Sequence, residues 1–315
     1  MKKFLITGGI LVAVGLVIFV ILLSCINWDF ANLSLYNNIS TEYAVDEAYN
    51  GISIITDTAD VTVRKSDDGK TSVVSFSPEK LCYSVLVENG ILLIKLEDSR
   101  KWYEKLFSTG TRLDVYIPQE EYSSLSIDLS TGDTKIYGDF TFGGIYVSAS
   151  TGDVECCASA NGEIDITTST GDINLENNSA GAVKLSVSTG DVELCAVNCV
   201  GDINIGVETG KTQMSDVNCK NLVTTGDTGD LIIDSVIATD KFNIKRSTGD
   251  VKFSGCDADE INVETSTGDV KGSLLTPKII FANTDTGKVI VPQYTTGGVC
   301  KIETSTGDII ITIGE

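Results

Sequence analysis

The sequence predicts an all-β protein whose main body is a single-chain parallel β-solenoid, or β-helix, of about ten coils with 19–20 residues each. Two observations predict this fold. Thr-Gly recurs with a spacing of 19 or 20 residues, and the residues before each glycine alternate between apolar and polar, which is the period of a strand. Helical repeats are excluded because they need about 33 residues or more. Parallel crossovers are expected to be right-handed. The ten corner glycines are Gly132, Gly152, Gly171, Gly190, Gly210, Gly229, Gly249, Gly268, Gly287 and Gly307.

Apolar residues recur at fixed distances from each glycine, as stacking of the coils requires. The residue seven positions before the glycine is always apolar, for example Leu125, Ile145 and Ile164. The residues five before and four after it are apolar with one exception each. Like residues therefore stack on like residues and form one core through the rod.

The residues around each glycine predict a tight corner. Glycine at all ten corners indicates a positive φ, where a Cβ atom would be strained. The threonine before it is expected on the inner side of the corner. The next residue is Asp, except for Lys211 and Lys288, and in those two coils the usual Ser two residues before the glycine is Glu208 or Asp285. We expect Glu208 to contact Lys211, Asp285 to contact Lys288, and each lysine to lie between acids of the two flanking coils.

The corner aspartates are the candidate ligand residues of the sequence. Asp133, Asp153, Asp172 and Asp191 follow four successive glycines, and their oxygens are the ligands that Ca²⁺ or Mg²⁺ prefers. A cation ladder is one interpretation. The other is that each aspartate caps its own turn. No other cofactor and no catalytic residue is predicted.

An uncharged segment of 23 residues, Phe4–Ile26, follows Lys2 and Lys3. At about 1.5 Å per residue it is long enough to span a bilayer core of about 30 Å, so residues 1–26 are predicted to be a cytoplasmic stub and a transmembrane helix. The positive-inside rule then places the N-terminus in the cytoplasm and the rest of the chain outside the cell. A cleaved signal peptide, or lipidation of Cys25 after Leu22-Leu23-Ser24, remains an alternative, and both would place the rod at the outer face of the cytoplasmic membrane.

The composition excludes several classes of function. The chain has no histidine, so neither a Ser-His-Asp triad nor a histidine-based zinc site can form. Its 23 basic and 44 acidic residues give a net charge of −21, which repels nucleic acid. We expect no nucleic-acid partner.

The chain divides into four parts. After the anchor, residues 27–40 are a polar spacer, residues 41–125 are an N-terminal β region that begins or caps the solenoid, and residues 126–315 are the solenoid itself. Strand patterns in the β region are broken by turn signals, of which Asn89-Gly90 predicts a hairpin. Cys199 and Cys219 occupy a column that is otherwise alanine, so they are expected to act as small core residues, with a disulfide between them left open.

The order of motifs resembles a known bacterial family. An anchor is followed by Asp98-Ser-Arg-Lys-Trp-Tyr103, Val115-Tyr-Ile-Pro118, Leu125-Ser-Ile-Asp128 and the repeated Ser-Thr-Gly-Asp-Val strands. This order is similar to that of the putative-adhesin family of β-strand-repeat proteins, a domain of unknown function, over nearly all of residues 41–315. The resemblance implies a β-solenoid surface domain, sometimes associated with envelope-stress regulation, and carries no catalytic residue.

Three functions remain open at this point. The first is a non-catalytic, membrane-anchored extracellular protein that binds a cell-surface protein or a polysaccharide, or acts as a scaffold. The second is a polysaccharide-acting β-helix enzyme, for which Arg246, a charged residue at an inward position, is the one irregularity. The third is a rod that associates end to end through an open C-terminal coil, because the chain finishes on the apolar strand 309–313.

Overall fold

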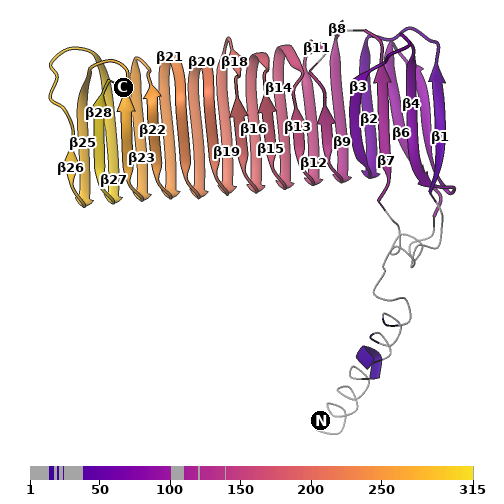
Figure 1. Ribbon diagram of the computed structural model, residues 1–315, viewed down its shortest axis with the longest axis horizontal. Coiled ribbons are helices and arrows are strands. Elements are labelled where there is room, and N and C mark those ends of the chain that lie inside the picture. The colour runs from indigo at the N-terminus through magenta and orange to yellow at the C-terminus, as the bar shows by residue number, and fades with distance from the viewer. Residues whose placement is uncertain are drawn as a thin grey trace.

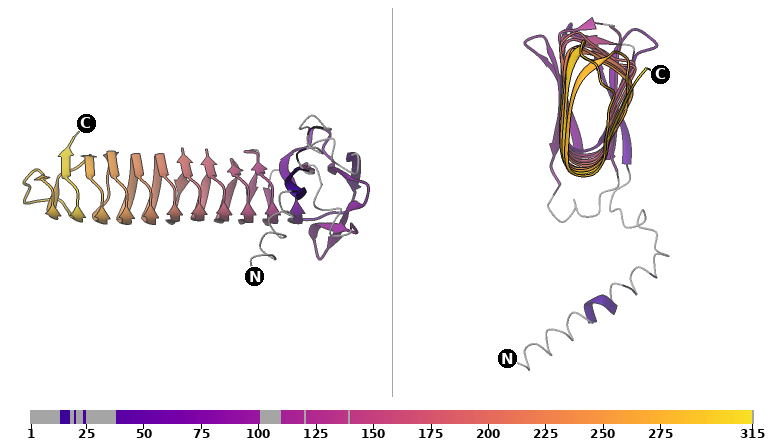
Figure 2. Two further views of the ribbon diagram at one scale, coloured as in Figure 1. Left: turned by 90° about the horizontal axis from the view of Figure 1, so that it is seen from below. Right: turned by 90° about the vertical axis from the view of Figure 1, so that its left-hand side faces the viewer.

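The computed structural model describes residues 14–17, 20, 24, 38–100, 110–119, 121–138 and 140–314. Over these residues the chain forms the predicted all-β parallel solenoid, a straight rod of stacked coils (Figure 1). Viewed along the rod, the coils superpose as flattened loops around a shared interior (Figure 2). Each coil has a long strand, a corner at the glycine, a second strand and a shorter third side.

The strands that precede the corners form one side of the rod, which we call the long sheet. Leu125, Ile145, Ile164 and Val183 lie directly over one another in this sheet, so the apolar columns are in register. The strands that belong only to this sheet are β2 (Gly51–Thr58), β6 (Ile91–Asp98), β9 (Ser124–Thr131), β12 (Ile145–Thr151), β19 (Asp202–Thr209), β23 (Glu260–Thr267), β25 (Lys278–Thr286) and β27 (Gly298–Thr306).

The strands that follow the corners form the second sheet on the other side of the core. They are β3 (Asp60–Lys65), β7 (Arg112–Ile117), β10 (Thr134–Ile136), β13 (Val154–Cys156), β15 (Ile173–Glu176), β17 (Val192–Cys195), β22 (Val251–Cys256), β24 (Val270–Leu274), β26 (Val289–Ile290) and β28 (Ile309–Ile313).

The third side closes each coil through short or shared strands. β14 (Ser159–Thr170) and β16 (Ser179–Thr189) begin here and run into the long sheet, while β20 (Thr212–Thr228) and β21 (Leu231–Thr248) run around the whole coil. The short strands are β8 (Glu121–Tyr122), β11 (Thr141–Phe142) and β18 (Asn198–Cys199). The second sheet turns into this side at residues with φ near 55°, namely Asn177, Ala196, Asp216, Ser235 and Gly255.

The core contains the columns that the periodicity predicted. Leu125, Ile145, Ile164 and their counterparts have no exposed surface, except for Ile280 in the outermost coil, which is half-buried. One expectation is wrong: the threonines directly before the glycines, such as Thr131, are exposed. The strand bends before the corner, so the last inward position is three residues before the glycine, as at Leu129.

The N-terminal end of the rod is covered by antiparallel strands. Thr58-Ala59-Asp60-Val61 forms a coil like the others, and β2 pairs in parallel with β9, so the solenoid begins well before residue 126. Outside it lies the coil of β6 and β7, which pairs with β2 and β3. Three strands then cover this outermost coil: β5 (Leu81–Glu88) against β6, β4 (Thr71–Pro78) against β7, and β1 (Asn38–Val45) against β4. The predicted Asn89-Gly90 hairpin joins β5 to β6 and is confirmed.

The C-terminal end does not follow the sequence order. β27 lies between β23 and β25, and β28 lies between β24 and β26. The last coil of the sequence, that of β27 and β28, therefore lies inside the stack, between the coil of β23 and β24 and the coil of β25 and β26. The outermost coil is that of β25 and β26 (Figure 1). The expectation that strand 309–313 forms the open end is wrong for Ile309 and Ile310, which pair with both β24 and β26, whereas residues 311–313 pair with β24 alone.

The predicted membrane anchor, residues 4–26, lies almost entirely outside the described residues. Within the described part of the chain, no helix has both the length and the apolar character needed to cross a membrane. Cys25 and the Lys101–Tyr103 part of the family motif also lie outside the described residues.

Candidate binding face

The ten corner glycines lie in one file along the edge between the two sheets. Their φ values run from 133° to 154°, a region open to glycine alone. A Cβ atom at any of them would also overlap a carbonyl oxygen of the neighbouring coil, for example that of Gly171 in the case of Gly190. Glycine is therefore needed twice over, for the backbone angle and for the close approach of the coils.

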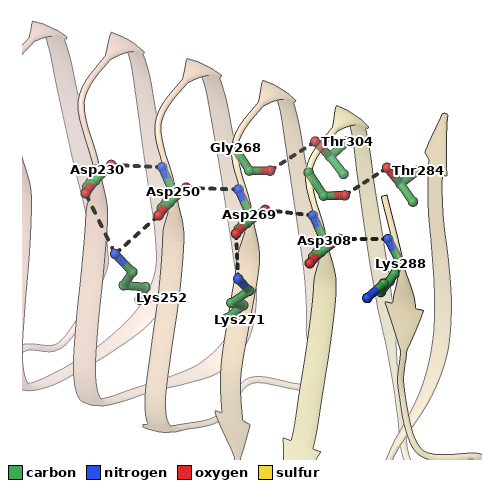
Figure 3. Close-up of polar contacts among 11 residues, drawn as sticks. Asp230, Asp250, Lys252, Gly268, Asp269, Lys271, Thr284, Lys288, Thr304 and Asp308 are labelled. Carbon is green, nitrogen blue, oxygen red and sulfur yellow. Dashed lines mark hydrogen bonds and ion pairs between the residues drawn. The ribbon is translucent and has the colours of Figure 1, made fainter. Parts of the chain in front are cut away.

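The aspartates beside these glycines form a carboxylate ladder that is interrupted once, at Lys211. The Oδ1 atom of each aspartate accepts a hydrogen bond from the backbone N–H of the corresponding residue in the next coil, at 2.7–3.0 Å (Figure 3). Asp133, Asp153, Asp172 and Asp191 all bond in this way, so each caps the next coil rather than its own turn. The ladder consists of Asp60, Asp133, Asp153, Asp172, Asp191, Asp230, Asp250, Asp269 and Asp308.

The predicted cation ladder would have to use the same carboxylates. Their Oδ1 atoms are engaged with amides, and among the residues that the structure describes no group of three or more acidic or cysteine side chains is arranged to hold a metal ion. Lysines approach the ladder instead. Lys252 Nζ lies 3.3 Å from Asp250, and the hydrogen bond from Lys271 holds the pKa of the Asp269 carboxyl below its usual value.

The two lysines that replace ladder aspartates do not pair as expected. Lys211 donates to Gln213, and within the described chain neither Glu208 nor Asp285 forms an ion pair with the lysine of its own corner. Lys211 does lie between Asp191 and Asp230. Lys288 does not lie between two acids: the exchange of the last two coils leaves Asp308 as its only ladder neighbour.

The outward face of the long sheet carries a row of shallow, open hollows. Near the N-terminal end, a hollow of about 390 Å³ is lined by Ser126, Asp128, Tyr146, Asp165 and Thr167. A smaller one of about 260 Å³ follows, where Gly206 has no side chain. A third, of about 390 Å³, lies over β21, β23 and β27. All three lie on the same face. The first and third lie between side chains four and six residues before the corner, and the second lies between side chains two and four residues before it.

The third hollow is lined by more charged and amide side chains than the other two. Lys245 pairs with Glu264 at 3.1 Å, and Lys301 with Glu303 at 2.9 Å. Asn243 and Asn262 line the same hollow, two residues before Lys245 and Glu264 in the same strands. At its edge, the hydrogen bond from Lys241 lowers the pKa of the Glu260 carboxyl. This arrangement offers donors and acceptors side by side, on a surface too flat to enclose a small molecule.

The family comparison agrees with this architecture. The model of the Toastrack DUF4097 family matches residues 49–206 and 197–315 of the chain, which together make up most of its length. The chain belongs to the Toastrack family. No curated protein matches it.

Several solved structures are similar to the chain at low sequence identity. A lipid-binding protein of Parabacteroides distasonis, described as putative, shares 17% identity and covers 75% of this Toastrack chain and 94% of its own, with a TM-score of 0.47. A putative adhesin of Bacteroides fragilis shares 15% identity over 85% and 97%, with a TM-score of 0.45. A putative adhesin of Parabacteroides distasonis shares 13% over 86% and 98%, with a TM-score of 0.47.

Arg246 is the most unusual core residue of this Toastrack chain. It is only 3% exposed, and its Nη2 atom donates to Thr212 at 2.8 Å, whereas Nε and Nη1 have no partner among the described residues. The guanidinium lies against Gly226, where any side chain would overlap it. Burial lowers the pKa of Arg246. Because it is buried, this arginine cannot contact a substrate on the surface.

The cysteines of the solenoid behave as core residues. Cys199 and Cys219 are each 4% exposed, lie in the predicted column of small residues, and are not joined by a disulfide. Burial raises the pKa of the Cys219 thiol to about 12. Nothing in their surroundings therefore favours a reactive thiolate.

Proposed function

We propose that this Toastrack chain is a non-catalytic, membrane-anchored extracellular binding protein whose long-sheet face holds an extended polar polymer, a cell-surface polysaccharide. The observation that carries the proposal is the row of open, polar hollows along one face of the rod. A polymer lying along the rod would meet new side chains about every 4.8 Å, which is the spacing of the strands.

The chemistry of the hollows supports a carbohydrate. Hydroxyl groups need both donors and acceptors, and the third hollow supplies the amides of Asn243 and Asn262 beside the ion pairs of Lys245 and Lys301. The exposed ring of Tyr146 offers an apolar surface in the first hollow. The uncharged segment of residues 4–26 supports an anchor in the membrane, with the rod outside.

The enzyme alternative is weakened by the position of Arg246. That residue was the single irregularity in favour of a catalytic site, and its side chain is buried against Gly226. The hollows are also open rather than enclosed, so they offer little means of excluding water from a reaction.

The test is a binding assay with the full chain in detergent micelles. The probes are insoluble cell-wall polysaccharide and soluble neutral and acidic glycans, and released reducing ends are measured in the same tubes. The combined variant Asn243→Ala and Asn262→Ala should weaken binding at least tenfold. Asn174→Ala, on the second sheet, is the matched control and should bind like the parent chain.

Two results would overturn the proposal. One is the absence of binding to every polysaccharide tested, and the other is an equal loss with Asn174→Ala, which would mean that the hollow is not the contact. Release of reducing ends with turnover would show an enzyme instead.

A further inference from the structure

The two ends of the rod are built differently. At the N-terminal end, β5 and β4 cover the edges of β6 and β7, and β1 extends that cover (Figure 1). Antiparallel strands in this place prevent another solenoid from continuing the parallel stack. Head-to-tail joining of two chains is therefore blocked at this end.

At the C-terminal end the stack is left open. In the described chain β25 pairs only with β27, and β26 pairs only with β28 (Figure 2). In the other coils the N–H of an inward residue donates toward the following coil, as from Leu125 N to Gly144 O. By the same pattern, the amides and carbonyls of the inward residues Ile280, Ala282 and Thr284 face the free edge of β25. Such an edge is a template for another strand.

Apolar side chains gather at this open end. Phe281 is 59% exposed and Ile290 is 57% exposed, at outward positions that are mostly polar in other coils. The inward residues Ile280 and Ala282 are only half-buried, because no further coil lies over them. The outermost coil therefore presents both unpaired backbone and uncovered apolar surface.

The charge of this end suits a second copy of the same chain. The chain has 44 acidic and 23 basic residues, so two rods repel each other along most of their length. Residues 275–298, in contrast, contain a single acid, Asp285, and two lysines: Lys278 is buried in an ion pair with Asp257, and Lys288 is exposed. Lysine replaces aspartate at the corner of this coil, so the carboxylate ladder ends there without a carboxylate.

We propose that two copies of the chain bind tail to tail, with the β25 strands antiparallel across a two-fold axis. The central residues of β25, from Ile279 to Thr284, are uncharged, so this pairing brings no like charges together. The interface uses the same patch on both copies, so the assembly closes at a dimer.

A consequence follows if the chain is anchored as in the proposed function. The open end lies at the far end of the rod from β1 (Figure 1). Chains held in two facing membranes would then bring their open ends together. This consequence rests on the proposed anchor, whereas the dimer itself does not depend on the anchor or on polysaccharide binding.

The experiment is sedimentation velocity on the full chain in detergent micelles, at concentrations from about 1 to 100 µM. The parent chain should shift from monomer to dimer. Phe281→Lys places a charge at the interface, and Ala282→Pro removes a donor from the free edge, where proline is tolerated because no neighbouring strand needs that N–H. Each should weaken dimerisation at least tenfold. Tyr146→Lys is the matched control, an exposed aromatic residue in the same column but far from the end, and should leave the dimer intact.

Each outcome decides the proposal. A parent chain that stays monomeric over the whole range overturns it, and so does a dimer that survives both end variants, since its contact then lies elsewhere, the anchor included. Oligomers that keep growing with concentration show an open contact instead of a closed two-fold dimer. Circular dichroism of the variants separates a lost interface from a lost fold.

Discussion

Replacing Gly190 with alanine tests how closely the coils approach at their corners. Gly190 has a φ of 146°, and its Cβ atom would overlap the Gly171 carbonyl oxygen. The backbone strain costs about 1–3 kcal/mol. Separating the coils would also weaken the hydrogen bonds from Gly190 N to Thr209 O and from Asp191 N to Asp172 Oδ1, at about 0.5–1.5 kcal/mol or more each. Together these terms give a loss of about 2–6 kcal/mol.

Urea unfolding followed by circular dichroism measures this loss. Gly69→Ala is the matched control, because Gly69 also has a positive φ, of 71°, but a Cβ atom there would have no heavy atom within 4 Å. The control should therefore cost only about 1 kcal/mol of strain. Equal losses for the two variants would refute the reasoning, since the cost would then come from the backbone angle alone and not from the contact between coils.

Four further predictions follow from the same contacts. Asp172→Ala removes the acceptor of a backbone amide and should cost about 1.5–3 kcal/mol in urea unfolding, whereas Asp172→Asn keeps an oxygen and should cost less; equal costs would contradict the capping role. Lys271 lowers the pKa of Asp269 in the folded chain, so this carboxylate stabilises the fold above its unfolded pKa of about 3.9. That stability is lost as the pH falls through the lower pKa of the folded chain. Lys271→Ala should flatten this dependence of stability on acid pH, and an unchanged profile would count against the contact. Cys82 is exposed and should react with a membrane-impermeant maleimide in intact cells, whereas reaction only after lysis would place the rod inside the cell. Cys219, whose pKa burial raises to about 12, should stay unreactive at pH 8 in the folded chain, and modification as fast as that of Cys82 would show that its burial is wrong.

The stack could be predicted from the sequence because each coil repeats the same physical requirement. The corner needs glycine for its backbone angle and its close contact, so Gly132 to Gly307 record the period directly. The coil at Thr58-Ala59-Asp60-Val61 escaped detection because alanine replaces the glycine. The backbone at Ala59 does not have a positive φ, so a Cβ atom is accepted there.

The second corner of each coil could not be recognised in the sequence, because it has no recurring residue type. Asn177, Ala196, Asp216 and Ser235 all take φ values near 55°, but this left-handed region admits a Cβ atom at a modest cost. No single residue type is required, so no motif recurs. The position six residues after each glycine could have been found only by aligning the coils on the first corner.

The order of the last two coils could not be predicted either. The coils at Gly287 and Gly307 carry the same apolar columns, so either order buries a similar core. A signal was nevertheless present in the outward residues, since Phe281 and Ile290 are apolar where most coils are polar. The prediction that Lys288 lies between acids of two flanking coils depended on that order, so it was wrong for the same reason.

Distances along the rod test the stacking most directly. Spin labels can be placed at Ser130 and at one of the equivalent positions Ser188, Ser247, Ser305 or Asp285, none of which is buried. The accessible cysteines of the chain are replaced by serine, and the distance between the labels is measured by pulsed electron paramagnetic resonance. Each coil adds about 4.8 Å, so the distances should rise in proportion to about 14, 29, 38 and 43 Å in that order. A distance to Asp285 shorter than that to Ser305 would contradict the exchanged ends, and distances that do not rise with coil number would contradict the solenoid itself.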